Sequence, residues 1–190
     1  MSTRHPTTDQ LESRLDSVRA APSDTGWLAL IVRRPAVDER ELLEEGELHP
    51  DHGLVGDTWK DRGSSRTEDG SAHPDTQLNV MNARAAAMVA DSDDVGRWAL
   101  AGDQLYLDFD ISATNAPPGT RLTIGEAIIE VTAEKHTGCK KFSARFGADA
   151  WRFVNSEVGM ELKLRGVNAR VVRPGTIRRG DAVRKVVEGG

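Results

Sequence analysis

The strongest structural signal in the sequence lies in residues 117–135, PPGTRLTIGEAIIEVTAEK. It contains two runs rich in aliphatic and β-branched residues, TRLTI and AIIEVTAE, with Gly125 and Glu126 between them. Two such runs joined by a short connection that contains glycine are typical of a β-hairpin. The sequence therefore predicts antiparallel strands in its C-terminal half.

Further strand signals are spread along the chain. Residues 102–111, GDQLYLDFDI, alternate apolar and polar side chains, which predicts a half-buried strand. Residues 27–33, WLALIVR, form a compact apolar run that is typical of a buried strand. The other predicted strands are residues 77–81, 169–175 and 181–187, with a turn at Pro174 and Gly175 before the last of them.

Helical spacing of apolar residues occurs in three segments. Leu11, Leu15 and Val18 predict one short amphipathic helix within residues 8–20. The other predicted helices are residues 83–90, which are rich in alanine, and residues 143–154. We expect residues 35–46 to form an exposed helical turn that ends at Gly46, and residues 53–73 to form a long irregular loop with a functional role.

Many short strands with a few helices and no alternating βαβ order predict an α+β fold that is mostly β. We expect a small β-barrel of mixed or antiparallel strands with a few peripheral helices. The chain of 190 residues divides into residues 1–25, expected as a flexible N-terminal segment with a short helix, and residues 26–187, expected as a single domain.

Composition excludes several classes of function. A net charge of −5 argues against binding nucleic acid through overall charge, although a local basic patch remains open. No apolar run is long enough for a membrane span, and the first ten residues lack the apolar core of a signal peptide. The single cysteine excludes an intramolecular disulfide and fits a reducing compartment, so we expect a cytoplasmic protein.

That one cysteine, Cys139, lies in the cationic segment HTGCKKFSARFG, residues 136–147. We expect Gly138 to adopt an unusual backbone angle and the sulfur to lie at the mouth of a pocket, near the start of a helix. A helix N-terminus and nearby cations favour a thiolate, which is a nucleophile and a soft metal ligand. The alternative interpretation is a small buried apolar side chain.

The basic residues of this segment also suggest an anion site, because lysine and arginine both bind phosphate. His136 precedes Cys139 by three residues and is a candidate general acid or a group that orients the thiolate. A plain hydrogen-bonded histidine is the alternative. More distant candidates for the anion site are Arg62, Arg66, Asn168 and Arg170, and a solvated basic face is the alternative for each. His49, His52 and His73 are weaker candidates for a metal site.

Several motifs together resemble the MOSC domain, the family named after the C-terminal part of molybdenum cofactor sulfurase. They are GDQL at residues 102–105, the hairpin G-x-x-L-x-I-G-x-A-x-x-E-V-T, the single cysteine followed by a helix, and the corner V-x-x-G-x-I-x-x-G-D. GLVGD at residues 53–57 matches an early glycine–aspartate segment of the family. The resemblance covers residues 26–187 and is most specific in the C-terminal half.

The resemblance implies a β-barrel, binding of a molybdenum–pterin cofactor or handling of sulfur, and, at the level of the family, pyridoxal phosphate binding. Some family members reduce N-hydroxylated small molecules with the cysteine as molybdenum ligand. Carried over, Cys139 is the metal ligand or the persulfide carrier and a catalytic residue together with His136. The residues implied in binding the cofactor are Lys140, Lys141, Arg145, Asp103, Asn115, Asn168 and Arg170.

The chain shows no segment like the companion domains that donate electrons or sulfur in some family members, so we expect a separate donor protein as partner. Neither a nucleic acid nor a membrane is expected as a partner. A second hypothesis belongs to another class of function. It describes a non-catalytic binding module whose basic pocket holds an anionic ligand or a partner protein.

Overall fold

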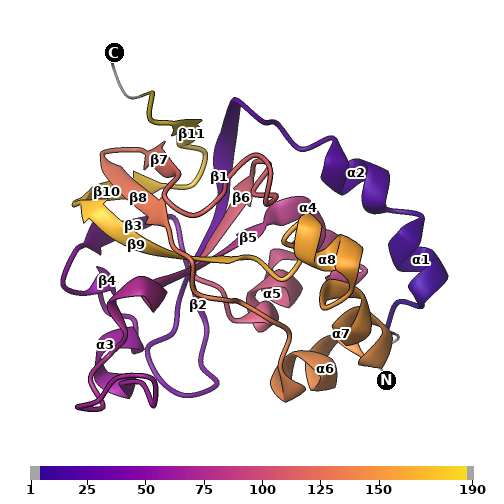
Figure 1. Ribbon diagram of the computed structural model, residues 1–190, viewed down its shortest axis with the longest axis horizontal. Helices are drawn as coiled ribbons and strands as arrows, with labels where there is room; N and C mark the ends of the chain where they lie inside the picture. The colour runs from indigo at the N-terminus through magenta and orange to yellow at the C-terminus, as the bar shows by residue number, and fades with distance from the viewer. Residues whose placement is uncertain (1–4, 188–190) are drawn as a thin grey trace.

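The computed structural model describes residues 5–187 and shows a β-barrel with helices gathered along one side (Figure 1). None of the helices in this range has the length and hydropathy needed to span a bilayer. The strands are β1 (Thr25–Arg33), β2 (Glu41–Leu43), β3 (Glu45–His49), β4 (Gly53–Leu54), β5 (Leu78–Asn82), β6 (Leu105–Asp108), β7 (Arg121–Ile124), β8 (Ala127–Val131), β9 (Val167–Arg173), β10 (Gly175–Arg178) and β11 (Ala182–Lys185).

The main sheet closes on itself. Its strands follow the order β11-β7-β8-β9-β5-β6-β1-β2, and an additional pairing between β11 and β1 closes a ring of seven strands that leaves β2 outside. Among the described strands of this sheet, only β5 and β6 run parallel, whereas the other pairs are antiparallel. Strands β10, β3 and β4 form a second, smaller sheet. The predicted mixed barrel, mostly β with peripheral helices, is confirmed.

The predicted hairpin of residues 117–135 is β7 and β8, which pair in register from Arg121 with Glu130 to Ile124 with Ala127. Gly125, at the turn, has a φ of 54°, a backbone conformation that favours glycine. Val131 also accepts a hydrogen bond from the amide of Gly119, so the start of the hairpin is tied to its end.

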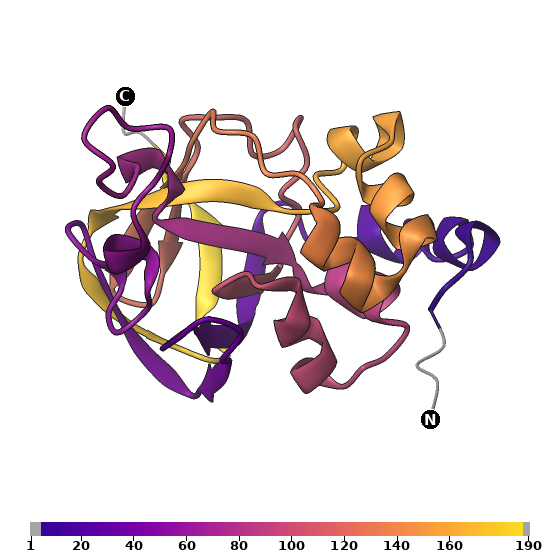
Figure 2. The same ribbon diagram turned by 90° about the horizontal axis from the view of Figure 1, so that it is seen from below.

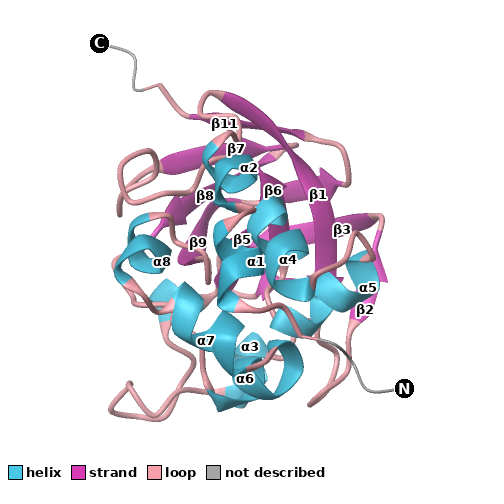
Figure 3. Cartoon of the chain, turned by 90° about the vertical axis from the view of Figure 1, so that its right-hand side faces the viewer, coloured by secondary structure: helices cyan, strands magenta, loops and turns pink. Residues whose placement is uncertain are grey.

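The helices are α1 (Thr8–Glu12), α2 (Leu15–Arg19), α3 (Trp59–Arg62), η1 (Pro74–Thr76), α4 (Ala83–Ala90), α5 (Val95–Trp98), η2 (Ala99–Ala101), α6 (Lys140–Phe146), α7 (Ala148–Val154) and α8 (Glu157–Glu161). Seen end-on in Figure 3, most of them cover one side of the barrel. Figure 2 shows the exception, because the segment that contains α3 lies at the end of the molecule away from α7 and α8.

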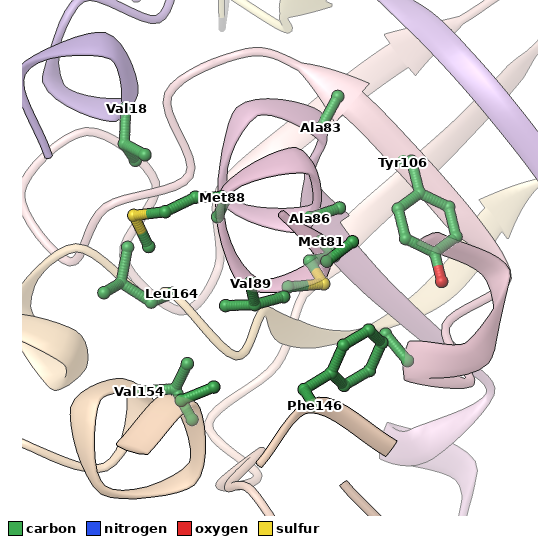
Figure 4. Close-up of a cluster of buried hydrophobic side chains, with 14 of the residues drawn as sticks. Val18, Met81, Ala83, Ala86, Met88, Val89, Tyr106, Phe146, Val154 and Leu164 are labelled. Carbon is green, nitrogen blue, oxygen red and sulfur yellow. The ribbon is translucent and has the colours of Figure 1, made fainter. Parts of the chain in front are cut away.

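Strand β6 joins the two hydrophobic cores of the protein. Leu105 and Leu107 point into the barrel, whereas Tyr106 packs in a second core between the barrel and the helices. Figure 4 shows this second core, in which Met88 and Val89 of α4 lie near Val18, Val154 and Leu164. The alternation predicted for this strand is therefore present, but the strand is buried on both faces because the helices cover the outer one.

Three local predictions differ from the structure. Residues 35–46 contain β2 and the start of β3 instead of a helical turn, because Glu41–Leu43 pair with the end of β1. Residues 143–154 are divided between α6 and α7 at Gly147, whose φ of 94° no helix accommodates. Residues 8–20 form α1 and α2 instead of one helix, although Leu11, Leu15 and Val18 are all buried as their spacing suggests.

The predicted N-terminal segment, residues 1–25, can be compared with the structure only from residue 5, since residues 1–4 lie outside the described residues. The boundary at residue 26 stays a prediction. The long segment 53–73 contains β4 and α3, and Trp59 anchors it by burying its side chain.

Candidate functional site

The segment Gly102-Asp103-Gln104 leads into β6 and connects three groups of polar side chains. Gly102 accepts a hydrogen bond from Nη1 of Arg34 at 3.0 Å. The Gln104 side chain is fully buried, and its Nε2 donates to Asp57 at 3.3 Å. Gly102 starts the segment with a φ of 91°, a backbone conformation that favours glycine.

Asp103 is the most enclosed charge of this region and has no solvent exposure. Its carboxylate accepts from Arg165 at 2.7 Å and lies 2.9 Å from Nε2 of His136. Arg165 is also nearly buried, donates to the carbonyl of Ala101 at 2.9 Å, and covers the ring of Phe142 in α6 at 5.1 Å. These contacts connect the segment before β6 to α6, the helix that follows Cys139.

Opposite forces act on the ionisation of this trio. Burial raises the pKa of Asp103, but the charge of Arg165 and the hydrogen bond from His136 outweigh it, and the net pKa lies below the ordinary value. The pKa of His136 is also lowered, first by burial and then by the charge of Arg165. His136 is therefore held as the neutral imidazole at neutral pH, with Asp103 as its hydrogen-bond partner.

Cys139 lies directly before α6 with extended backbone and is exposed to solvent. The alternative of a small buried apolar side chain is therefore wrong. Gly138 does not have positive φ, so the expected unusual backbone angle is also wrong. Glycine is favoured there by close packing, because a Cβ atom would lie 3.1 Å from Val154 and 3.2 Å from Trp151.

The helix α7 and its C-terminal end hold the segment before the cysteine in place. Nε1 of Trp151 donates to the carbonyl of Gly138 at 2.9 Å, and the Asn155 side chain accepts from the Gly138 amide at 3.0 Å. Two polar side chains thus fix the residue next to Cys139 while the sulfur itself remains accessible.

The electrostatic surroundings of the sulfur favour the thiolate. Partial burial raises the pKa of Cys139, but the backbone amides of Phe142 and Lys141 and the charge of Arg165 lower it, and the net pKa lies below 9.0. The two amides belong to the first turn of α6, directly after Cys139. The predicted direction of the effect is present, with Arg165 as its charged source.

A cluster of arginines lies on the other side of the Gly102 turn. It consists of Arg34 from the end of β1, Arg40 from the following loop, Arg62 from α3 and Arg145 from α6. In Figure 1 the loop that joins β1 to β2 lies between α3 and α6, which brings these positions together. A Cβ atom on Gly102 would lie 3.5 Å from Arg40 and 3.9 Å from Arg145, so both guanidinium groups border this glycine.

The charges of this arginine cluster are only partly compensated. Asp57 binds Arg34 through both carboxylate oxygens, at 2.9 and 2.7 Å, and Asp38 lies 3.0 Å from Arg145. Within residues 5–187, Arg62 has no ion-pair partner and Arg40 bonds only to backbone carbonyls.

Burial comes first among the causes that lower the pKa of both Arg40 and Arg62. The next cause is repulsion, by Arg145 for Arg40 and by Arg34 for Arg62. The cluster contains four guanidinium groups and two carboxylates. Its excess positive charge favours the binding of an anion.

The structure brings together only part of the predicted site. Asp103 and His136 are in contact, and Lys141 and Arg145 both reach Asp38, at 3.6 and 3.0 Å. Lys140 is exposed beside Cys139.

Three other predicted residues have partners of their own. Asn168 is buried and binds the carbonyls of Glu134 and Lys135 just before His136, at 3.1 and 3.3 Å. Asn115 binds Lys185 and the carbonyl of Asp110, and Arg170 pairs with Glu130 and Asp75 on the outer face of β9. The contacts of Asn115 and Arg170 therefore join them to other parts of the barrel.

Sequence reasoning missed Arg34, Arg40 and Arg165, which form the charged surroundings of the site. No local motif marks them, because they come from the β1 end, a loop and the residues before β9. One signal could have revealed Arg34. It directly follows the buried strand pattern of residues 27–33, so it lies at the end of a barrel strand. The aspartate of GLVGD, Asp57, is its buried partner at 2.7 Å.

The weaker metal hypothesis finds no support. Within the described part of the chain, no group of three or more histidine, cysteine, aspartate or glutamate side chains is arranged to hold a metal ion. The rings of His49 and His52 instead pack against each other at a tilt of 46°, with centroids 5.3 Å apart. The large cavities also lie away from Cys139. His136 lines a small one of about 60 Å³, whereas two of about 500 and 480 Å³ border Trp27 and Trp98.

Comparisons with known proteins agree with the barrel. The family model of the MOSC domain matches residues 67–184, which is more than half of the chain. No curated protein sequence matches significantly.

Solved structures with the same fold include the YUAD protein from Bacillus subtilis. It has 12% identity and a TM-score of 0.63 over 86% of this chain and 97% of that one. YiiM from Escherichia coli has 18% identity and a TM-score of 0.55 over 86% of this chain and 71% of that one. YiiM from Geobacillus stearothermophilus has 12% identity and a TM-score of 0.54 over 86% and 74% of the two chains.

Proposed function

Because the chain belongs to the MOSC domain family, we propose that Cys139 is its functional sulfur, acting as the ligand of a molybdenum–pterin cofactor. The proposed activity is reduction of N-hydroxylated small molecules with electrons from a separate donor protein. The observation that carries the proposal is the combination of one exposed, thiolate-favouring sulfur with a partly uncompensated arginine cluster, to which helix α6 after Cys139 contributes Arg145.

The residues present fit such a cofactor in two respects. A thiolate is a soft ligand for transition metals, and Cys139 is accessible. The pterin cofactor carries a phosphate, and Arg40 and Arg62 lack carboxylate partners within the described residues. Because α6 begins after Cys139 and also carries Arg145, one helix connects the sulfur to the cationic cluster.

Each side chain of the site has a distinct part in this proposal. The cofactor supplies a metal centre that accepts and donates electrons. Arg165 stabilises the Cys139 thiolate while Asp103 holds the guanidinium in place. Neutral His136 keeps one ring nitrogen on Asp103 and has the other available for a proton. Trp151 and Asn155 fix Gly138 so that the sulfur keeps its position.

A second role, sulfur carriage, is favoured by the solvent exposure of the sulfur. In this role the Cys139 thiolate attacks the outer sulfur of a persulfide on a donor protein. The new S–S bond forms on Cys139 as the donor's S–S bond breaks, and the donor leaves as a thiolate. A depressed thiol pKa increases the fraction of the attacking form at neutral pH.

The test is the molybdenum content of the full chain purified from a host that makes the cofactor. We expect metal in the wild type, loss of metal in Cys139→Ser and reduced content in Arg40→Gln. Arg121→Gln is the matched control, because it removes the same charge from the distant β7. Full metal content in Cys139→Ser would refute ligation by this sulfur.

Sulfur carriage is tested on the same samples. After incubation with a persulfide donor, intact mass should rise by about 32 Da per sulfur in the wild type and not in Cys139→Ser. A wild type that neither holds molybdenum nor gains this mass would refute both roles. Cellular function that persists in Cys139→Ala would then favour the binding-module hypothesis.

A further inference from the structure

A groove lined by two tryptophans lies on the outer face of β1, away from Cys139. It joins the two cavities of about 500 and 480 Å³, which share Trp27, Ala29 and Trp98 on their walls. Helices α2, α4 and α5 border it. A volume of this size is typical of sites for small organic molecules. We call this surface the tryptophan groove.

The two indoles differ in how they are held. Trp98 is partly buried, and its Nε1 donates to the carbonyl of Ser92 at 2.7 Å, which fixes the ring at the groove wall. Trp27 leaves 47% of its surface exposed although it lies in a barrel strand. An aromatic side chain exposed beside a cavity presents apolar surface to water, and a bound molecule would bury that surface.

The side chains that line the groove include one more carboxylate than guanidinium groups. Three arginines line it, and each is already paired: Arg14 with Asp91, Arg84 with Asp108 at 2.7 Å, and Arg179 with Glu44 at 2.7 Å. The fourth carboxylate on the wall, Asp93, has no ion-pair partner within residues 5–187. The groove is therefore one unit negative.

This pattern excludes two ligand classes. An anion would face guanidinium groups that are already neutralised and a carboxylate that repels it. A hydrated metal ion prefers several oxygen ligands, and the described residues contain no cluster of three or more metal-binding side chains. An organic cation matches both features, because indole faces attract cations and also contact apolar groups.

We propose that the tryptophan groove binds a small organic cation of the trimethylammonium class, with Trp27 and Trp98 contacting its methyl groups and Asp93 supplying the opposite charge. This site is separate from the Cys139 site and does not depend on the function proposed above. The groove residues belong to α4, α5, β1 and the segments next to them, whereas Cys139 lies before α6.

The test is isothermal titration of the full chain with choline and with dimethylbutanol, its neutral isostere in which carbon replaces nitrogen. Choline should bind more tightly by roughly 2- to 30-fold, the range of a cation–π contact at exposed to desolvated sites. Trp27→Ala and Asp93→Asn should each weaken choline binding within the same range. Both positions are exposed, and unchanged circular dichroism verifies that the variants fold.

Two control variants show whether binding depends on the groove itself. Asp16→Asn removes the same charge from an exposed position of α2 that does not line the groove, and choline affinity should not change. Cys139→Ser should also bind choline normally, so failure of one proposal leaves the other unaffected. Equal affinity for dimethylbutanol, no saturable choline binding, or unchanged affinity in both groove variants would overturn the proposal.

Discussion

At the scale of single residues, the buried arginines of the site are held in place by ion pairs with buried aspartates. Arg34 and Asp57 form one pair and Arg165 and Asp103 another, and all four side chains are nearly or fully buried. A buried charge is tolerated only when its partner and hydrogen bonds are in place. These pairs therefore keep guanidinium groups inside the barrel rim, where they set the charge around Cys139 and Gly102.

Replacing one partner of the Arg34–Asp57 pair tests this view. Asp57→Asn leaves the Arg34 charge uncompensated and should lower the free energy of unfolding by about 3–5 kcal/mol. Glu41→Gln is the matched control, because it makes the same chemical change in a more exposed pair with Arg33 and should cost at most about 1 kcal/mol. Urea unfolding measures both, and equal losses would contradict the proposed role of burial.

The reactivity of Cys139 gives a second prediction at this scale. Burial opposes ionisation, yet the amides of Phe142 and Lys141 and the charge of Arg165 lower the thiol pKa. The rate of alkylation by iodoacetamide should therefore rise with a midpoint at a lower pH in the folded protein than in the chain unfolded in urea. Arg165→Gln should move this midpoint upward, and Arg121→Gln should leave it unchanged. A midpoint that is no lower in the folded wild type than in the unfolded chain would argue against a thiolate-favouring site.

At the scale of elements, the site depends on where α6 and α7 separate. Gly147 lies between them with a φ of 94° and a ψ of 163°, a conformation available essentially only to glycine. The break lets α7 turn back so that Trp151 and Asn155 reach Gly138. A continuous helix through residue 147 would carry these two side chains away from the residue beside Cys139.

A substitution at the break tests its importance. Gly147→Ala should destabilise the protein by about 1–3 kcal/mol from backbone strain, and more from contact with His5, since the new Cβ would lie 2.7 Å from the His5 Cβ. Gly70→Ala also has positive φ but meets no atom within 4 Å, so it should cost only the strain of a surface loop. Thermal unfolding compares the two, and equal costs would show that the contact does not matter.

At the scale of the whole molecule, closure of the barrel and the helix layer together bury both faces of β6. Asp103 then has no solvent exposure, and its partner His136 is only partly exposed, although both side chains are polar. Stability consequently depends on pH through groups whose pKa values differ between the folded and unfolded chain.

The direction of that dependence follows from the pKa shifts. Burial lowers the folded pKa of His136 below 6.5, so its contribution is complete above that pH and is lost as pH falls through the folded pKa. Asp103 acts later, because Arg165 and His136 outweigh burial and hold its pKa below 3.8. We expect the melting temperature to begin falling below about pH 6.5, and to fall less in His136→Gln between pH 6.5 and 5. Parallel curves for both proteins would contradict this assignment.

Much of the architecture follows from local patterns. The β7–β8 hairpin, helix α4 and the buried positions Leu11, Leu15 and Val18 were all predicted, because neighbouring residues alone set their periodicity and turn. The position of Cys139 before a helix was predicted for the same reason. Residues 41–43 were missed because pairing with β1, and not their own sequence, decides their conformation.

By itself, the sequence determined the class of fold, the site of the only thiol and its cationic neighbours in the chain. Only the tertiary structure decided that Arg34, Arg40, Arg62 and Arg145 converge near Gly102, and that Asn115 and Arg170 have partners elsewhere. The physical reason is range. Periodicity and turns arise from interactions between residues close in the chain, whereas a shared electrostatic environment depends on distances that exist only after the barrel has closed.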